Sequence, residues 1–421
     1  MPELEKPDIH AAAAAAGLRP PDDCVPFESR ATHLPWFDRV DPFWLGFGAN
    51  PSYNWQGPTE AEWFPVWHPY GPKWMSRWVT RTEPIEGRKW TSQGGRIERV
   101  AGLLISWHVL TSQQIAAMGG MDPSGVNRTL DAMMRAGLVE RSKMVARYST
   151  SSSMPFLWRL RLESREYQGW FKALTEEQRW ALTLGVEGGS GGHERHDVVI
   201  AEVALRAIEV MPKLQAIFGE RAAPAKLLLA DQPKVRSRGD AVLVRDDGLR
   251  IILELTTQPT IPDVRRKMTQ WARLLGERGG PSETGVVVIF LSGQYAGGGV
   301  EHLQRSYDRA ITPEAIGGDN PAPPEVLLAA RASIFVAHWQ DWFPATWCIS
   351  TGFASLEAFY SPSLGKFFPA KVGVAGPGGV PFRPTRDMDW QQPRRDRDKL
   401  PAIPRWIEGP IQWVAEQEDV S

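Results

Sequence analysis

Hydrophobic residues at helical spacing open the first structured region of the 421-residue chain. Ile97, Val100 and Leu104 fall on one face of a predicted helix. Thr111 and Gln114 form a capping box ahead of a second helix. The next residues predict a third helix over residues 122–137, capped by Asp122, and strands over residues 138–141, 144–148 and 156–162.

Three helices followed by a hairpin are the order of a winged helix-turn-helix, which we predict over residues 93–163. Three side chains near the N-terminus of its third helix would face the major groove of DNA: Ser124, Asn127 and Arg128. Basic residues of the strands would lie beside the phosphates: Arg141, Lys143, Arg147, Arg159 and Arg161. Such domains also mediate protein contacts, and scattered arginines commonly form a solvated face. Double-stranded DNA is the partner that we favour.

The second structured region contains a β-hairpin with an acidic residue on each strand. Two runs rich in Val, Ile and Leu flank an Asp-Asp-Gly sequence. A three-residue loop would place Gly248 in the left-handed region and pair Arg245 with Leu249. Counting outward, Asp240 then faces Glu254, with Cβ atoms about 4.5–5.5 Å apart. A two-residue loop would instead put the two acids on opposite faces of the sheet.

Two facing carboxylates are costly unless a cation lies between them. At an effective dielectric constant near 20 they repel by roughly 3 kcal/mol. Mg²⁺ is bound in proteins by one or two carboxylates together with water molecules. Asp240 and Glu254 therefore predict a Mg²⁺ or Mn²⁺ site, and two solvated acids at the strand ends are the simpler alternative.

The elements around the hairpin predict an αβββαβ domain over residues 193–340. A helix that begins near residue 193 carries His196 on its apolar face, where a core histidine is commoner than a ligand, and Glu202 lies beside that face. A helix after Pro262 buries Val264, Met268, Trp271 and Leu275. Strands are predicted over residues 226–230, 285–291 and 333–337, and a further helix over residues 300–311.

Tryptophan is unusually frequent and lies mainly at the two ends of the chain. The chain has 19 Trp residues, concentrated before residue 110 and after residue 338. Because disordered tails are poor in aromatic residues, we assign residues 1–92 and 341–421 to irregular Trp- and Pro-rich extensions that pack on the protein itself or on a partner. A base-stacking platform is the alternative. Residues 164–192 are predicted to be a connector.

Charge and cysteine content narrow the class of protein. The formal net charge is −1, so binding of nucleic acid requires local basic patches. The two cysteines, Cys24 and Cys348, exclude a disulfide framework and a Cys-based zinc site, and they suit a reducing compartment. No signal peptide and no apolar run of about 18 residues is found. We expect a cytoplasmic, multidomain α+β or α/β protein without membrane insertion.

The order of helix, three strands with paired acids, helix and buried strand resembles the PD-(D/E)xK nuclease core. Gly239-Asp240 stands where that family has Pro-Asp, and Glu254-Leu255-Thr256 stands where it has Glu-x-Lys, so the lysine is missing. With the preceding winged helix, the helix of His196 and the Arg265-Arg266-Lys267 sequence, residues 95–295 resemble the replication-relaxation family of plasmids, phages and integrative elements. That family commonly has an acidic residue where this chain has Thr256.

The resemblance implies a DNA-binding protein of a mobile element that nicks DNA with Mg²⁺ or Mn²⁺ held by Asp240 and Glu254. Lys267 lies at the edge of the apolar face of its helix and would replace the missing lysine, and His196 or Glu202 would assist. One alternative is a DNA-binding platform that does not cleave. Another is a structural or adaptor component of a phage particle or DNA-transfer machine, whose Trp-rich ends contact other proteins of the particle or mobile element.

Overall fold

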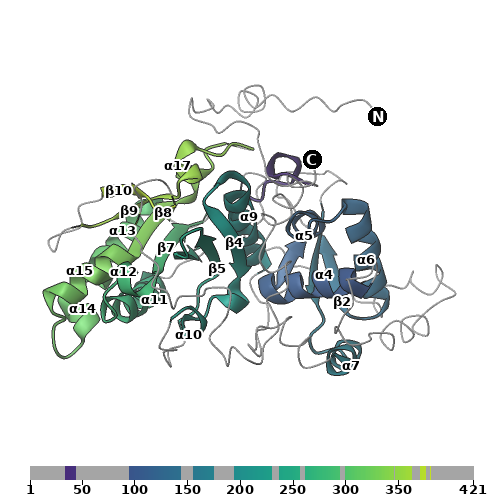
Figure 1. Ribbon diagram of the computed structural model, residues 1–421, viewed down its shortest axis with the longest axis horizontal. Helices are drawn as coiled ribbons and strands as arrows, with labels where there is room; N and C mark the ends of the chain where they lie inside the picture. The colour runs from purple at the N-terminus through teal and green to yellow at the C-terminus, as the bar shows by residue number, and fades with distance from the viewer. Residues whose placement is uncertain are drawn as a thin grey trace.

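The computed structural model places two sheets and their helices side by side (Figure 1). A three-stranded sheet with three helices forms a smaller unit at one end, and a seven-stranded sheet with its own helices forms the larger part. The structure describes residues 34–43, 94–143, 155–174, 194–229, 237–256, 261–293, 299–345, 347–362, 370–375 and 380.

The smaller unit combines helices with the three strands of one antiparallel sheet. Its elements are α4 (Gly94–Trp107), β1 (Val109–Thr111), α5 (Ser112–Gly119), α6 (Pro123–Arg135), β2 (Val139–Lys143) and β3 (Phe156–Leu160). The predicted caps are confirmed. The Thr111 hydroxyl accepts a hydrogen bond from the Gln114 amide at 3.0 Å, and the Asp122 carboxylate accepts one from the Gly125 amide at 2.9 Å.

The sheet of the smaller unit differs from the prediction in two ways. β1 was not predicted, because three residues between two helices give too short a pattern; it pairs with β3. The short strand predicted over residues 138–141 extends to Lys143 and is itself the partner of β3. The strand predicted over residues 144–148 lies outside the described residues.

The first part of the predicted connector is a packed helix, α7 (Arg165–Ala173). The hydroxyl of Ser164 caps it by accepting a hydrogen bond from the Tyr167 amide at 3.0 Å. Tyr167 and Trp170 are buried, so this helix belongs to the core of the smaller unit and is not a free linker. The short helix predicted over residues 175–184 lies outside the described residues.

The larger sheet has the order β10-β9-β8-β7-β6-β5-β4. β4 to β6 are antiparallel, β6 to β8 are parallel, and β9 and β10 add an antiparallel edge. Every residue of β5 and β7 is buried, so both faces of the sheet are covered. The strands are β4 (Leu214–Gly219), β5 (Ala241–Arg245), β6 (Arg250–Thr256), β7 (Val286–Ser292), β8 (Ile334–His338), β9 (Glu357–Tyr360) and β10 (Ala370–Gly373).

Two groups of helices cover this sheet. α9 (Glu194–Val210) packs on β4, β5 and β6 and also contacts α5 and β1 of the smaller unit. α11 (Ile261–Gly276), α13 (Gly299–Ala310) and α15 (Pro324–Ser333) pack on one another and on β7 and β8. The apolar face predicted for α11 is confirmed, because its four residues are all buried. Short helices complete the fold: η1 (Trp36–Asp38), η2 (Glu220–Ala222), α10 (Ala225–Leu228), α12 (Pro281–Thr284), α14 (Pro313–Gly317), α16 (Trp339–Trp342) and α17 (Thr351–Ala354).

Two expectations about the larger sheet were wrong. The strand predicted over residues 226–230 is replaced by the helix α10, whose N-cap is Pro224. The strand that pairs with β5 comes earlier, as β4. The sheet also continues past residue 340, because β9 and β10 extend it into the segment assigned from composition to the C-terminal extension.

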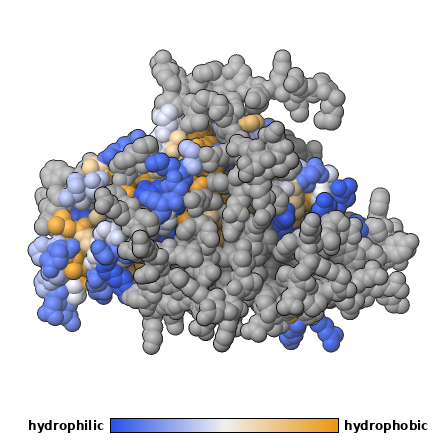
Figure 2. All heavy atoms as spheres, viewed as in Figure 1, coloured by the Kyte–Doolittle hydropathy of each residue, from blue (hydrophilic) through white to orange (hydrophobic). Residues whose placement is uncertain are grey.

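Hydrophilic and hydrophobic side chains alternate over the described surface at the end formed by α14 and α15 (Figure 2). Among the described residues, Leu328 of α15 is the large hydrophobic side chain that is exposed, at 44%. No helix among the residues that the structure describes has the length and apolar character of a membrane span.

Buried charges fix the N-terminal segment of residues 34–43 to α9. The Arg39 guanidinium lies 2.9 Å from Oε1 of Glu202 and 2.5 Å from Oε1 of Glu209, and all three residues are at most 2% exposed. Burial raises the pKa of Glu209 to about 7 even though Arg39 opposes that rise. Glu202, which we expected near the catalytic acids, is therefore part of this buried cluster.

The same segment also contacts the C-terminal part of the chain. Asp41 lies 3.3 Å from a terminal nitrogen of Arg206 on α9 and accepts a hydrogen bond from the Trp347 amide at 3.1 Å. The indole of Trp347 donates to the Arg39 carbonyl at 3.2 Å. The described part of the N-terminal extension therefore packs on the protein's own domain, as its aromatic content predicted.

Replacing Arg39 tests whether this buried cluster holds the fold together. Arg39→Met leaves Glu202 and Glu209 buried without their shared cation, and breaking a buried pair costs about 3–5 kcal/mol. We expect the free energy of unfolding, measured by denaturant titration, to fall by that amount. The control is Arg266→Met, because Arg266 pairs with Asp263 but is 71% exposed, and its loss should cost less than about 1 kcal/mol. Equal losses in the two variants would contradict the role of Arg39.

Candidate active site

The hairpin of β5 and β6 brings two carboxylates together in the predicted register. Gly248 has φ 89°, in the left-handed region, and Ala241 pairs with Leu253. The register ends at this pair, and the Asp240 amide, one residue beyond it, donates a hydrogen bond to the Leu253 carbonyl at 2.9 Å. The predicted hairpin register is confirmed over β5 and β6, and Asp240 and Glu254 come together at its end, where Lys267 contacts both.

Lys267 of α11 reaches both acids. Its ammonium lies 3.7 Å from Oδ1 of Asp240 and forms an ion pair with Oε2 of Glu254. Val264 and Trp271, one helical turn to either side of Lys267, are buried, so Lys267 stands at the edge of the packed face, with a side chain that is 42% exposed. The position that helical spacing predicted for this lysine is confirmed.

Each carboxylate is held by one oxygen and presents the other to Lys267. Oδ2 of Asp240 accepts a hydrogen bond from the Leu255 amide at 2.6 Å, and Oε1 of Glu254 accepts one from the Trp271 indole at 2.7 Å. Oδ1 and Oε2 face the ammonium. The two inner oxygens therefore converge on one point from neighbouring strands, in an orientation that the backbone and the indole fix.

The two acids differ in charge preference. Burial raises the pKa of Glu254 to about 8, although Lys267 acts against that rise. Burial also favours the neutral form of Asp240, but the charges of Lys267 and His196 outweigh it and hold the pKa of Asp240 well below its usual range. Asp240 therefore holds a negative charge more readily than Glu254.

His196, at the start of α9, is in contact with Asp240. Its Nε2 lies 3.1 Å from Oδ2 of Asp240 and 3.1 Å from the carbonyl oxygen of Leu255, and its Nδ1 lies 3.6 Å from Oδ1 of Asp197. Burial opposes a charge on the ring, but Asp240 and Asp197 together raise the pKa of His196 well above its usual value. The imidazolium thus bridges two carboxylates and positions Asp240.

Asp240 and Glu254 fit a hard divalent cation. Oε2 of Glu254 is buried and, among the described residues, has no hydrogen-bond partner beyond its ion pair with Lys267. Two converging carboxylate oxygens suit Mg²⁺ or Mn²⁺, which complete their coordination with water and phosphate oxygens. Glu202 is absent from this site, because it pairs with Arg39 and Arg206.

The three residues predicted to read DNA lie together on one exposed surface. Ser124, Asn127 and Arg128 are all exposed on α6, which forms the outer end of the smaller unit (Figure 1). The hydroxyl of Ser124 donates a hydrogen bond to the carboxylate of Asp122. The first two turns of α6 are therefore open to a partner.

Two basic residues of β2 and β3, Arg141 and Arg159, are engaged within the protein. Arg159 lies 2.5 Å from a carboxylate oxygen of Glu140 and 3.0 Å from one of Glu194, so its charge is matched within the protein. Its contact with a phosphate stays a prediction. The guanidinium of Arg141 lies over the ring of Phe156, 4.6 Å from its centre. The side chain of Lys143 and the whole of Arg147 lie outside the described residues.

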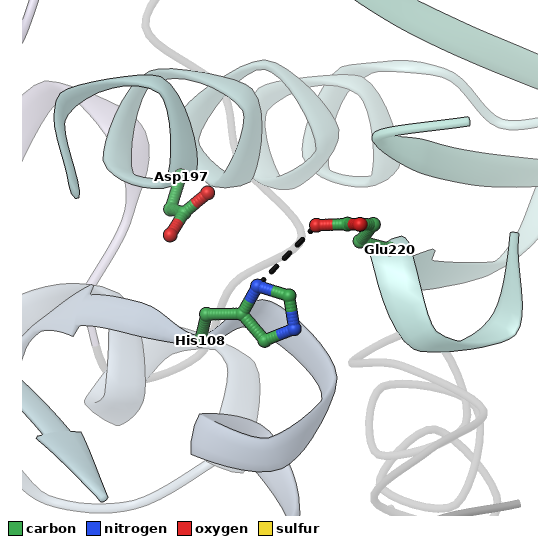
Figure 3. Close-up of side chains that lie close together, drawn as sticks. All are labelled: His108, Asp197 and Glu220. Atoms are coloured by element: carbon green, nitrogen blue, oxygen red, sulfur yellow. Dashed lines mark ion pairs between the residues drawn. The ribbon is translucent and has the colours of Figure 1, made fainter. Parts of the chain in front are cut away.

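A second group of possible metal ligands was not predicted: His108, Asp197 and Glu220 (Figure 3). One ligand atom of each residue lies within 4.8 Å of the other two. His108, between α4 and β1, has φ 62°. The three residues come from distant parts of the chain, so no spacing in the sequence signals them.

No protein-family model, curated protein or solved structure matches this chain. The geometry of these sites is the basis for the function proposed below.

The Asp240→Asn variant tests the charge of His196. It removes the anion that stabilises the imidazolium, whereas burial, which favours the neutral ring, remains. We expect the pKa of His196 to fall from well above its usual value of about 6.5 to that value or below it. ¹⁵N NMR of the labelled histidine between about pH 5 and 9 measures this change. The exposed Asp319→Asn is the control, and an unchanged titration in Asp240→Asn would contradict the ion pair.

Proposed function

We propose that this protein is a metal-dependent nuclease that nicks double-stranded DNA. The observation that carries the proposal is the contact of Lys267 with both Asp240 and Glu254. The PD-(D/E)xK pattern has its lysine two residues after the glutamate, where this chain has Thr256. An ammonium from α11 lies at the same two acids and supplies the cation that Thr256 cannot.

The order of elements supports this proposal. α9, the antiparallel strands β4, β5 and β6, the helix α11 and the strand β7, parallel to β6, follow one another along the chain. We infer from this order a PD-(D/E)xK-like domain, with the acids at the end of β6 and the start of β5.

Asp240 and Glu254 would hold a Mg²⁺ or Mn²⁺ ion through their inner oxygens. When bound, such an ion activates water and stabilises the charge of the leaving oxygen. The ammonium of Lys267 stabilises the negative charge that develops on the phosphate oxygens during attack. His196 and Trp271 keep the outer oxygens of the two carboxylates fixed, so the inner oxygens do not have to reorient when a substrate binds.

The smaller unit would supply the DNA-binding surface. Its three helices and antiparallel sheet have the element order of a winged helix, and the third helix carries Ser124, Asn127 and Arg128 on its exposed face. We propose that α6 enters the major groove, and that the protein serves a plasmid, phage or integrative element, as its resemblance to replication-relaxation proteins implies. A net charge of −1 confines the contact with DNA to such local surfaces.

One observation favours a second function, DNA binding without cleavage. Lys267 contacts both acids and His196 contacts Asp240, so two cationic side chains already balance the two carboxylates. In that case the nuclease-like domain would act as a platform or adaptor for other proteins of the mobile element or of a phage particle. Cleavage activity separates the two functions.

Conversion of supercoiled plasmid to open circles in Mg²⁺ or Mn²⁺ measures the proposed activity. We expect Lys267→Ala to lower the nicking rate by about 10²-fold or more, because a charge contact to the transition state is lost. Asp240→Asn should abolish the metal dependence. The matched control is Lys371→Ala: Lys371 pairs with Glu357 between β10 and β9, and its side chain is 48% exposed, close to that of Lys267.

The control variant should nick at the wild-type rate, and circular dichroism should show that Lys267→Ala is folded. Absence of nicking with both metals would exclude the nuclease and favour the platform. A similar loss in Lys371→Ala and Lys267→Ala would contradict the role of Lys267.

Binding of duplex DNA tests the surface of α6 separately. If about six phosphates are contacted, log K should fall with log salt at a slope near −5. Arg128→Ala should weaken a preferred duplex by about 1–3 kcal/mol and reduce base preference. Arg309→Ala is the control, since it removes an exposed arginine from α13 in the larger part of the molecule. An affinity that does not depend on salt would contradict α6 as the DNA-reading element.

A further inference from the structure

We propose that His108, Asp197 and Glu220 form a zinc site at the junction between the smaller unit and the seven-stranded sheet. The site is distinct from the Asp240 and Glu254 pair, and it does not depend on the nuclease proposal. It would join two parts of the chain that are far apart in sequence.

The three ligands come from three elements that meet at this junction. His108 lies between α4 and β1, Asp197 lies in the first turn of α9, and Glu220 begins η2 directly after β4. The elements are tightly packed: a Cβ atom added to Gly219 would lie 2.2 Å from the carbonyl oxygen of Ser106, which only glycine avoids. Close packing of this kind holds the ligands near one another without a metal.

The distances suit a tetrahedral ion. Nδ1 of His108 lies 3.3 Å from Oε2 of Glu220. Ligand atoms bound to zinc at about 2.0–2.1 Å in a tetrahedron are about 3.3–3.4 Å apart. The distance between Nδ1 of His108 and Oε2 of Glu220 already has this value. Asp197 projects from α9 toward His108 (Figure 3), and the largest separation in the cluster is no more than 4.8 Å. A small rotation of the Asp197 carboxylate would complete the set.

Asp197 provides the independent indication that a ligand belongs here. Its side chain is 8% exposed, and its Oδ2 has no hydrogen-bond partner among the described residues. The other oxygen faces His196 at 3.6 Å. A buried carboxylate oxygen without a partner is costly, and a bound cation would remove that cost.

The donor set selects the class of metal. One imidazole nitrogen and two carboxylate oxygens suit Zn²⁺, whereas Mg²⁺ and Ca²⁺ prefer oxygen ligands alone. Arg238 lies 3.1 Å from Oε1 of Glu220 and leaves Oε2 directed at His108. The side chain of Glu220 is 31% exposed, so an ion can enter from solvent on that side. Three protein ligands leave the fourth position to water.

Zinc binding to the full chain tests the site. After removal of metals with a chelator, wild-type protein is titrated with Zn²⁺ in competition with a chromophoric chelator, and with Co²⁺, whose visible absorption reports tetrahedral geometry. We expect one equivalent of Zn²⁺ and a tetrahedral Co²⁺ spectrum. His108→Asn and Asp197→Asn should each weaken binding by about 100-fold or more, because a direct ligand is lost. Asparagine tolerates the left-handed backbone at position 108.

Two further variants make the result decisive. Asp240→Asn should keep the full zinc equivalent, which separates this site from the nuclease-like acids. Glu220→Gln changes a part-exposed side chain and should also weaken zinc binding. It provides the test if the two variants at buried positions fail to fold. The proposal would be overturned if the metal-free wild-type protein bound no Zn²⁺ in the titration. It would also be overturned if the affinity for Zn²⁺ were unchanged in both Glu220→Gln and His108→Asn.

Discussion

The fold depends on neutralising the charges of α9, a helix that is buried between the two sheets. It carries Glu202, Arg206 and Glu209 at no more than 2% exposure. An unpaired ion in such surroundings costs several kcal/mol. Glu202 and Arg206 pair within the helix, and each of the three residues also takes a partner from another part of the chain. Arg39 supplies it for both glutamates and Asp41 supplies it for Arg206, which is why residues 34–43 are part of the core and not a tail.

The first turn of the same helix connects the two candidate sites. His196 contacts Asp240, and its neighbour Asp197 faces both His196 and His108. The first turn of α9 therefore presents His196 to Asp240 and Asp197 to His108. The charged residues further along the helix are paired with Arg39 and Asp41. The rigidity that these pairs give to α9 fixes the position of His196, and through it the orientation of the Asp240 carboxylate.

Local patterns in the sequence predicted those parts of the site that depend on local geometry. Gly248 fixes the turn and with it the pairing of Asp240 with Glu254, and helical spacing places Lys267 at the edge of its helix. Contacts between distant residues leave no such pattern. Helical spacing puts Glu202 beside the face of α9 that carries His196, which suggested a place near the acids. Its pairing with Arg39 became visible only in the packed fold. The Pro-initiated helix α10 and the edge strands β9 and β10 were missed for a related reason, because short elements take their structure from their neighbours.

The anchoring of residues 34–43 also determines which pieces of this chain are autonomous folding units. A fragment that began at residue 93, the boundary that composition suggests, would keep both glutamates of α9 and lose the guanidinium between them. Glu202 would keep Arg206, but Glu209 would lose the cation with which it pairs in a medium of low dielectric constant. The domain of the seven-stranded sheet is therefore not a separable module: its minimal unit includes a peptide that lies before the smaller unit in the sequence.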